Sequence, residues 1–347
     1  MERSICELAW NVSEPEYRAD PALSYSTLSR FEREGWRKLD SLFDRIETPS
    51  LTFGSAVDCM LTEGGEAFTQ RFIVCEFPSL SDNLISITKA LYHRFSNEHR
   101  KVSTIEDKYI DEVALSNGYY TNPKYANYRV KNIKESCDEY YSLLSLAGEK
   151  TILSQSDYND VVRCVEELRT SPATKHFFSN NPWDTNLEKV FQLKFKTEWN
   201  GIPIRCMFDC LSVDHKDKVI YPVDLKTTGH PEEEFYKSFI TWRYDIQATF
   251  YTYILQSVLN KDPYFSQFRI KPFQFITINR RTLAPLVWEF KLNFNERDLK
   301  DEQGNIYRNW RKILADLNYY ITHPNLKYSR EAIAYKYQME INNVTPV

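Results

Sequence analysis

Apolar residues recur at helical spacing through most of the N-terminal half of the chain. Ser156 to Arg169 shows the clearest stripe, because its apolar residues return every three or four positions along one side. A helix is also predicted over residues 21–46, where Ser and Thr can cap its start, and a short one over Phe53 to Thr62. The stripe of the first of these contains Leu28, Phe31, Leu39 and Phe43. Residues 84–180 are predicted to be mainly helical.

From about residue 187 the period changes to two residues. In the stretch LEKVFQLKFKTEW, apolar and polar residues alternate, which is the spacing of a β-strand. Asn200-Gly201 is a hairpin signal, so a second strand is predicted over Ile204 to Val213. A third strand is predicted over Val219 to Lys226, after the polar turn DHKDK. We therefore expect a β-sheet in the second half of the chain.

The remaining sequence alternates between helix and strand. A long helix is predicted over roughly Glu233 to Leu259, then strands in FQFITIN and LVWEFKL, then a last helix. The last helix is expected to carry Ile306, Trp310, Ile313 and Leu317. This order predicts the α/β class, with a mixed central β-sheet flanked by helices and a helical N-terminal region. No repeat or linker interrupts the chain, so we expect a single domain over residues 1–347.

Composition and charge narrow the setting without naming a function. A chain of 347 residues can bury a substantial core. It has no apolar run long enough for a membrane span, and its start, MERSICELAW, lacks the features of a signal peptide. Seven scattered cysteines suit free thiols in a reducing compartment, so we expect a cytoplasmic protein. The net charge of −4 neither favours nor excludes nucleic acid as a partner.

Two acids in predicted strands, and a lysine beside one of them, are the candidate chemistry. Asp224 and Lys226 are two residues apart, so in a strand both side chains point to the same face. Asp209 lies on the neighbouring strand, and two carboxylates with the Leu225 carbonyl between them offer the oxygen ligands that Mg²⁺ prefers. A lysine at such a site can orient or deprotonate a water, or stabilise charge on a phosphate.

The D-L-K triplet is weak evidence by itself, because D-x-K occurs by chance in most proteins. The predicted helix that follows strengthens it. Tyr244, Gln247 and Tyr251 fall at i, i+3 and i+7, so they share one face of that helix. The ordinary interpretation of Gln247 is a solvated helix residue, whereas the functional one is a polar group that faces the site.

Together these residues resemble the PD-(D/E)XK nuclease superfamily. The resemblance is to its phage exodeoxyribonuclease VIII (RecE-like) branch, related to the RecB nuclease domain and lambda exonuclease. It is carried by FDCLSV, VIYPVDLKTT and WRYDIQATFYTY. By position, the family's strand acid, its D/E-x-K and its Q-x-x-x-Y correspond to Asp209, to Asp224 with Lys226, and to Gln247 with Tyr251. Similarity extends to LSYSTLSRFEREGWRKL and LTFGSAVDCML and fades over about residues 78–150. It implies a helical part over residues 1–180 and a catalytic core over 181–347.

The resemblance adds two candidate metal ligands and removes one cofactor. Glu188 stands at the start of the first core strand, where these nucleases often carry a further glutamate. Asp58 occupies the place of the branch's usual histidine in G-x-x-x-H; a carboxylate can bind a hard metal but cannot act as a neutral imidazole. No cysteine lies beyond Cys210, so the iron–sulfur cluster of some relatives is not expected.

The resemblance implies a Mg²⁺-dependent deoxyribonuclease, with Mn²⁺ able to substitute, that degrades DNA from its ends as an exonuclease. Its implied setting is phage-type recombination or DNA processing. A single-strand annealing protein is then a candidate partner, and a homo-oligomer a candidate state. Two alternatives stay open: a nuclease-fold module that binds DNA or protein with little or no catalysis, and a structure-specific endonuclease. Asp58 motivates the module. The presence of Asp209, Asp224, Lys226 and Gln247 argues against it, since a module without catalysis has no reason to keep buried acids that repel each other without a metal.

Overall fold

A single mixed sheet forms the centre of the protein, whose structure is a computed structural model. It describes residues 3–44, 46, 48–77, 80–179, 186–291, 297–301, 303–324 and 326–335. Its main strands are β3 (Leu187–Trp199), β4 (Ile202–Asp214), β5 (Val219–Thr227), β7 (Phe273–Ile278) and β8 (Leu286–Phe290), in the spatial order β3-β4-β5-β7-β8, and the short strand β6 (Arg269–Ile270) pairs with β5 beside this row. β5 and β7 are parallel, and the other neighbours in that order are antiparallel. The expected fold class is confirmed.

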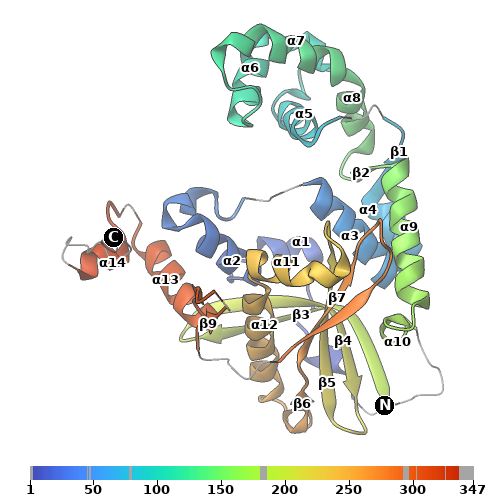
Figure 1. The fold of residues 1–347 in the computed structure, drawn as a ribbon, viewed down its shortest axis with the longest axis vertical. Coiled ribbons are helices and arrows are strands. Elements are labelled where there is room, and N and C mark those ends of the chain that lie inside the picture. The colour runs from blue at the N-terminus through green and yellow to red at the C-terminus, as the bar shows by residue number, and fades with distance from the viewer. Residues whose placement is uncertain are drawn as a thin grey trace.

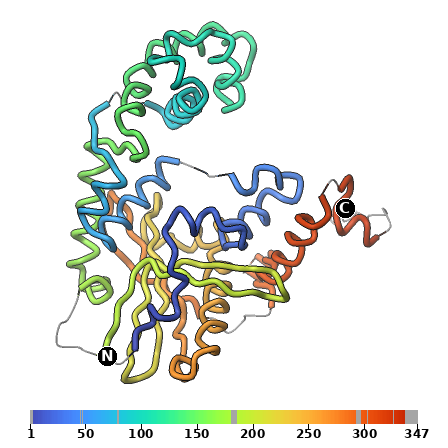
Figure 2. Tube along the Cα trace, turned by 180° about the vertical axis from the view of Figure 1, so that it is seen from behind, coloured from blue at the N-terminus to red at the C-terminus, as the bar shows by residue number. Residues whose placement is uncertain are grey.

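Helices cover both faces of this sheet (Figure 1). One face packs against α2 (Tyr25–Glu34), α12 (Tyr244–Leu259) and α13 (Trp310–Thr322) in the larger hydrophobic core. The other face packs against α3 (Pro49–Thr62) and α9 (Gln155–Thr170) in a second core. The N-terminal segment crosses the back of β3, where the Trp10 N–H donates to the Lys194 carbonyl at 2.8 Å (Figure 2).

The segment where the family resemblance fades forms a helical insertion, which we define as residues 80–147. It contains α5 (Asp82–Phe95), α6 (Asp107–Ser116), α7 (Ala126–Ser136) and α8 (Asp138–Ala147), which share a hydrophobic core of their own and lie together at the top of Figure 1. Two short parallel strands, β1 (Phe72–Cys75) and β2 (Thr151–Ser154), flank it in the sequence.

The remaining elements are short. They are η1 (Ile5–Leu8), α1 (Glu14–Ala19), η2 (Trp36–Ser41), α4 (Gly64–Arg71), η3 (Val102–Thr104), η4 (Pro123–Tyr125), α10 (Lys175–Phe178), η5 (Glu232–Glu234), α11 (Phe235–Trp242), η6 (Phe265–Gln267), β9 (Leu299–Lys300), β10 (Ile306–Tyr307) and α14 (Arg330–Ala334). Among the described helices, none combines the length and the apolar character that a bilayer span requires.

Two predicted helices are shorter than expected. The helix over residues 21–46 ends at Glu34, because Gly35 adopts a φ of +77°; η2 follows, and Phe43 beyond it is exposed. At the other end of the chain, Ile306 lies in β10 rather than in α13. In both cases the apolar spacing extends beyond the residues that form the helix.

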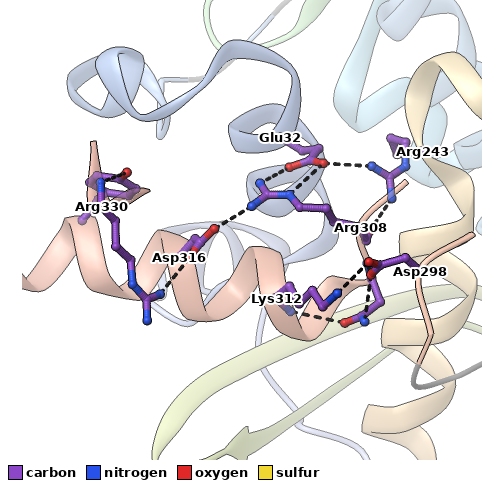
Figure 3. A network of polar contacts seen from close by, with 9 residues as sticks. Glu32, Arg243, Asp298, Arg308, Lys312, Asp316 and Arg330 are labelled. Atoms are coloured by element: carbon purple, nitrogen blue, oxygen red, sulfur yellow. Dashed lines mark hydrogen bonds and ion pairs between the residues drawn. The ribbon is translucent and has the colours of Figure 1, made fainter. Parts of the chain in front are cut away.

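The prediction of one helix from Glu233 to Leu259 is wrong, because Arg243 adopts a left-handed conformation with φ of +58° and separates α11 from α12. The guanidinium of Arg243 is buried. It binds Asp245 at 2.9 Å and Glu32 of α2 at 3.3 Å, and it donates to the Arg308 carbonyl at 2.6 Å (Figure 3). These contacts attach the start of α12 to α2 and to the segment before α13. They thereby position Gln247, which lies one turn into α12.

Gly54 allows α3 to approach the end of β5. A Cβ atom at residue 54 would lie 3.0 Å from the Thr227 hydroxyl oxygen, which is closer than side chains normally pack. Asp58 follows Gly54 by four residues and therefore lies on the same side of α3. The close approach at Gly54 brings Asp58 to the end of β5.

We expect Gly54→Val to lower the free energy of unfolding by about 1–3 kcal/mol, because the added side chain must push α3 away from Thr227. Urea unfolding measures this change. Gly65→Val is the matched control: Gly65 is exposed in α4 with no atom near its missing Cβ, so its effect should stay within about 0.5 kcal/mol. Equal stability of the two variants would contradict this account of the α3 contact.

Candidate active site

The candidate active site lies where β4 and β5 separate. The two strands pair from Asp214↔Val219 to Cys210↔Val223, and the next residues along each strand are Asp209 and Asp224. Beyond this point β5 continues to pair with β7. The edge of β4 that no longer pairs with β5 bonds to Leu23: the Leu23 N–H donates to the Pro203 carbonyl at 3.0 Å. The two acids therefore stand side by side at the end of the shared ladder.

Asp209 is reached by the backbone of β5. The Leu225 N–H donates to Asp209 Oδ2 at 2.8 Å, so a side chain takes the place of the β4 carbonyl that a continued ladder would supply. This contact holds the Asp209 carboxylate against the D-L-K segment. The same contact satisfies a backbone donor that the separation of the strands would otherwise leave without an acceptor.

A paired irregularity in β3 and β4 directs two side chains into the site. Gln192 of β3 and Asp209 of β4 are opposite each other, but they do not pair. The residues on both sides of them pair in one constant register. Gln192 has a φ of +54°, in the left-handed region. On β4, Phe208 belongs to the larger core, whereas Cys210, two residues on, belongs to the second core. The alternation of both strands therefore shifts at this pair, so that neither side chain follows the pattern of its strand.

Asp224 lies at the buried centre of the site, with 3% of its surface exposed. The side-chain amide of Gln247, from α12, donates to Asp224 Oδ1 at 2.5 Å. The ammonium group of Lys226 contacts Asp224 Oδ2 and lies 4.8 Å from the ring centroid of Tyr244. Asp224, Lys226 and Gln247 are thus brought together.

Asp58 approaches from the opposite face of the sheet, on α3. The side-chain amide of Gln192 donates to Asp58 Oδ2 at 2.7 Å. The other carboxylate oxygen, Oδ1, is buried without a hydrogen-bond partner, and so is Oε1 of Gln247. Within the described part of the chain these two buried acceptor oxygens have no donor, which is unusual in a folded protein and fits oxygens that can bind a cation.

The electrostatics of the site favour an added cation. Burial, together with the charge of Asp224, raises the pKa of Asp58 to about 7. Burial and the carboxylates of Asp224 and Asp58 likewise raise the pKa of Asp209 well above its ordinary value. Although burial disfavours the charged form of Lys226, the Asp224 carboxylate raises the pKa of its ammonium group. One lysine thus faces three acids.

The donor set fits Mg²⁺ or Mn²⁺, although the described residues hold no three His, Cys, Asp or Glu side chains already gathered as a metal cage. Each acid is instead turned toward a different donor: Asp209 to the Leu225 N–H, Asp224 to Lys226 and Gln247, and Asp58 to Gln192. The available ligand atoms are oxygens, which hard divalent cations prefer. The Oδ1 atom of Asp58, which is buried without a hydrogen-bond partner among the described residues, fits such a ligand best.

Two expected site residues make their contacts with other parts of the fold. Glu188 is buried near the N-terminal segment, where it accepts hydrogen bonds from the Ser4 hydroxyl and the Ile5 N–H and contacts His215 at 2.9 Å. It lies four residues along β3 from Gln192, or about 13 Å at strand spacing. Tyr251 lies in the larger core, with its ring 5.3 Å from that of Phe208. Of the two, only Tyr251 packs behind the site.

Two residues near the reactive groups were missed from the sequence. Gln192 falls in a regular apolar–polar alternation, and nothing in that pattern signals its left-handed backbone. Tyr25 packs its ring 6.3 Å from that of Tyr244 and donates its hydroxyl to the Trp242 carbonyl at 2.7 Å. The available signal for Tyr25 was its place at the start of a predicted helix, which says nothing of a contact 219 residues away in the sequence.

Comparisons with known proteins support the family and leave the activity open. No curated protein matches the chain. A crystal structure from Eubacterium rectale, described as a candidate exonuclease, aligns with 96% of this chain and 96% of its own, at 11% identity and a TM-score of 0.44. Nothing about the activity of this chain follows from so low a similarity. A family of PDDEXK-like domains of unknown function (DUF3799) matches residues 24–282, a span that includes Asp58, Asp209, Asp224, Lys226 and Gln247. Because that match covers most of its length and the whole candidate active site, the chain belongs to the family of PDDEXK-like domains.

Proposed function

We propose that this protein is a Mg²⁺-dependent deoxyribonuclease that hydrolyses phosphodiester bonds. The observation that carries the proposal is that the buried carboxylates of Asp58, Asp209 and Asp224 interact with one another beside the ammonium group of Lys226. Phosphodiester hydrolysis needs charge compensation for both the attacking water and the phosphate. A site with an excess of buried acid oxygens can hold the metal that supplies it, and membership of the PDDEXK-like family agrees with this chemistry.

Each residue has a role in the proposal. Asp209, Asp224 and Asp58 would hold the metal, with the Leu225 carbonyl as a further ligand. The metal would supply Lewis-acid charge and a water of lowered pKa. Lys226 keeps its proton beside Asp224, because its pKa is raised, so it would orient the water and stabilise negative charge on the phosphate. Gln247 holds Asp224 in place, and Tyr251 supports α12 from the core.

The substrate is proposed to be a DNA end, and the protein an exonuclease. This part rests on the resemblance to the RecE-like branch in the sequence. The rival is a binding module with little or no catalysis, motivated by Asp58 in place of the branch's histidine. The close contact of Lys226 with Asp224 supports the enzyme, because a module has no need of a lysine held at buried acids.

Asp224→Asn and Lys226→Met should each lower DNA cleavage by a factor of about 10³ or more, since each removes a charge at the reacting phosphate. The measurement is the initial rate of nucleotide release in Mg²⁺, with circular dichroism to establish that both variants fold. Lys216→Met, in the exposed turn before β5, is the control and should cleave like the wild type. Wild-type rates in either site variant would show that the site is assigned wrongly.

Linear duplex DNA should be degraded in Mg²⁺, whereas covalently closed circular DNA should stay intact, because an exonuclease needs an end. Ca²⁺ should support DNA binding without turnover, as expected when a larger cation occupies an oxygen site. Agarose gels and binding isotherms measure the two effects. Cutting of the circle would favour the endonuclease, and binding that needs no metal, with no cutting, would favour the module.

Stability without metal should fall as the pH rises from 5.5 to 8. The pKa of Asp58 is raised to about 7 in the folded protein. Between the ordinary pKa of an aspartate and pH 7, the folded state therefore binds more protons than the unfolded state, so the free energy of unfolding falls as the pH rises. The expected loss in the free energy of unfolding is about 1 kcal/mol or more. Urea unfolding in EDTA measures it.

Asp58→Asn is the matched control, because it cannot ionise and yet can still accept from Gln192. Its stability should vary less with pH over the same range. Adding Mg²⁺ to the wild-type protein at pH 8 should restore the free energy of unfolding that it lost in EDTA. A wild-type protein whose stability is flat over this range would contradict the electrostatic account of Asp58.

A further inference from the structure

We propose that Gln192 is a positioning residue for the metal site: its strained backbone places its amide against Asp58, so that the free oxygen of Asp58 is held toward the cation. The inference rests on the proposed function, since it assigns a role at the same site. It goes beyond that function because Gln192 belongs to none of the motifs that identified the site.

The backbone of Gln192 is strained where no turn requires it. Its φ of +54° lies in the region that favours glycine, and among the described non-glycine residues with positive φ it is the one inside a β-strand. Asn200 and Lys218, by contrast, lie in the turns that join β3 to β4 and β4 to β5. A glycine at residue 192 would accept this backbone without the clash of a Cβ atom. The side chain of Gln192 must therefore offset the strain or serve the site.

The side chain of Gln192 makes one contact that matters at the site. Its Nε2 donates to Asp58 Oδ2 at 2.7 Å, across 134 residues of sequence. With Oδ2 occupied in this way, the carboxylate cannot rotate freely, and its other oxygen remains buried and without a partner. The charge of Asp224 raises the pKa of Asp58, and a cation held by both carboxylates would relieve this repulsion. The Gln192 amide thus sets which oxygen of Asp58 is available to a cation shared with Asp224.

The opposite residue on β4 supports the same interpretation. Asp209 and Gln192 leave the ladder together, while the register is the same on both sides of the pair. The irregularity therefore shifts no strand pairing along the sheet, and its local result is the delivery of two side chains to the site. Strain of this kind is found at functional sites, where the surrounding structure holds it in place.

Gln192→Gly should have opposite effects on stability and on metal affinity, because it removes both the backbone strain and the amide that holds Asp58. Without the Cβ atom the backbone strain is relieved, so the melting temperature of the metal-free protein should rise by about 2 °C or more. Without the amide, Asp58 is free to rotate, so the affinity for Mn²⁺ should fall about tenfold, as it does when a residue that orients a metal ligand is lost. The measurements are differential scanning calorimetry in EDTA and Mn²⁺ titration followed by electron paramagnetic resonance, both on the full chain.

Two further variants separate strain from positioning. Gln192→Leu keeps the strained φ and removes the amide, so it should lose Mn²⁺ affinity without gaining stability. Asn200→Gly relieves a similar φ of +50° in the hairpin away from the site, so it should gain stability with the affinity unchanged. A Gln192→Gly protein that binds Mn²⁺ like the wild type would overturn the positioning role. One that melts below the wild type would overturn the account of the strain.

The experiment also separates this inference from the proposed function. Asp224→Asn measured in the same titration shows whether the Mn²⁺ signal comes from this site. If Asp224→Asn abolishes Mn²⁺ binding while Gln192→Gly leaves it unchanged, the nuclease proposal survives and the role of Gln192 is rejected. If the wild type binds no Mn²⁺ that depends on Asp224, the proposed metal site itself is rejected.

Discussion

The separation of β4 from β5 is the constraint on which the site depends. A strand that leaves its neighbour exposes backbone donors that need acceptors in a buried place. Here the Leu225 N–H is satisfied by the Asp209 carboxylate, and the free edge of β4 is satisfied by Leu23. Leu23 leads directly into α2, whose Tyr25 packs beside Tyr244 and hence beside Lys226. The hydrogen bonds that let the two strands separate thus also bring the aromatic surroundings of the lysine into place.

The same region carries an electrostatic cost that the rest of the fold must offset. Asp58 and Asp209 have raised pKa values because they are crowded by Asp224 away from water, and a single ammonium group faces all three. Large cores on both faces of the sheet hold these acids together against their repulsion. Arg243 adds a second restraint, because its contacts with Glu32 and the Arg308 carbonyl prevent α12 from carrying Gln247 away from Asp224 (Figure 3).

The helical insertion is built differently from the part of the chain that holds the site. It has its own hydrophobic core and is flanked by the two short strands β1 and β2 (Figure 1). None of the residues of the candidate active site belongs to it. This agrees with the fading of the sequence resemblance over about residues 78–150, whereas the division of the chain into a helical part and a core within one domain stays a prediction.

Local sequence determined the strands, the Asn200-Gly201 hairpin, and the shared face of Asp224 and Lys226, because a period of two residues and a turn signal act between neighbours in the chain. The D-x-K and Q-x-x-x-Y spacing likewise indicated Gln247 beside Asp224. Tertiary structure alone decided three features: the break between α11 and α12 at Arg243, the direction of the Gln192 side chain toward Asp58, and the packing of Glu188 against the N-terminal segment. Each of these depends on a contact between residues more than 130 positions apart. Periodicity carries no information about such partners, because they meet only when the sheet and its helices have packed.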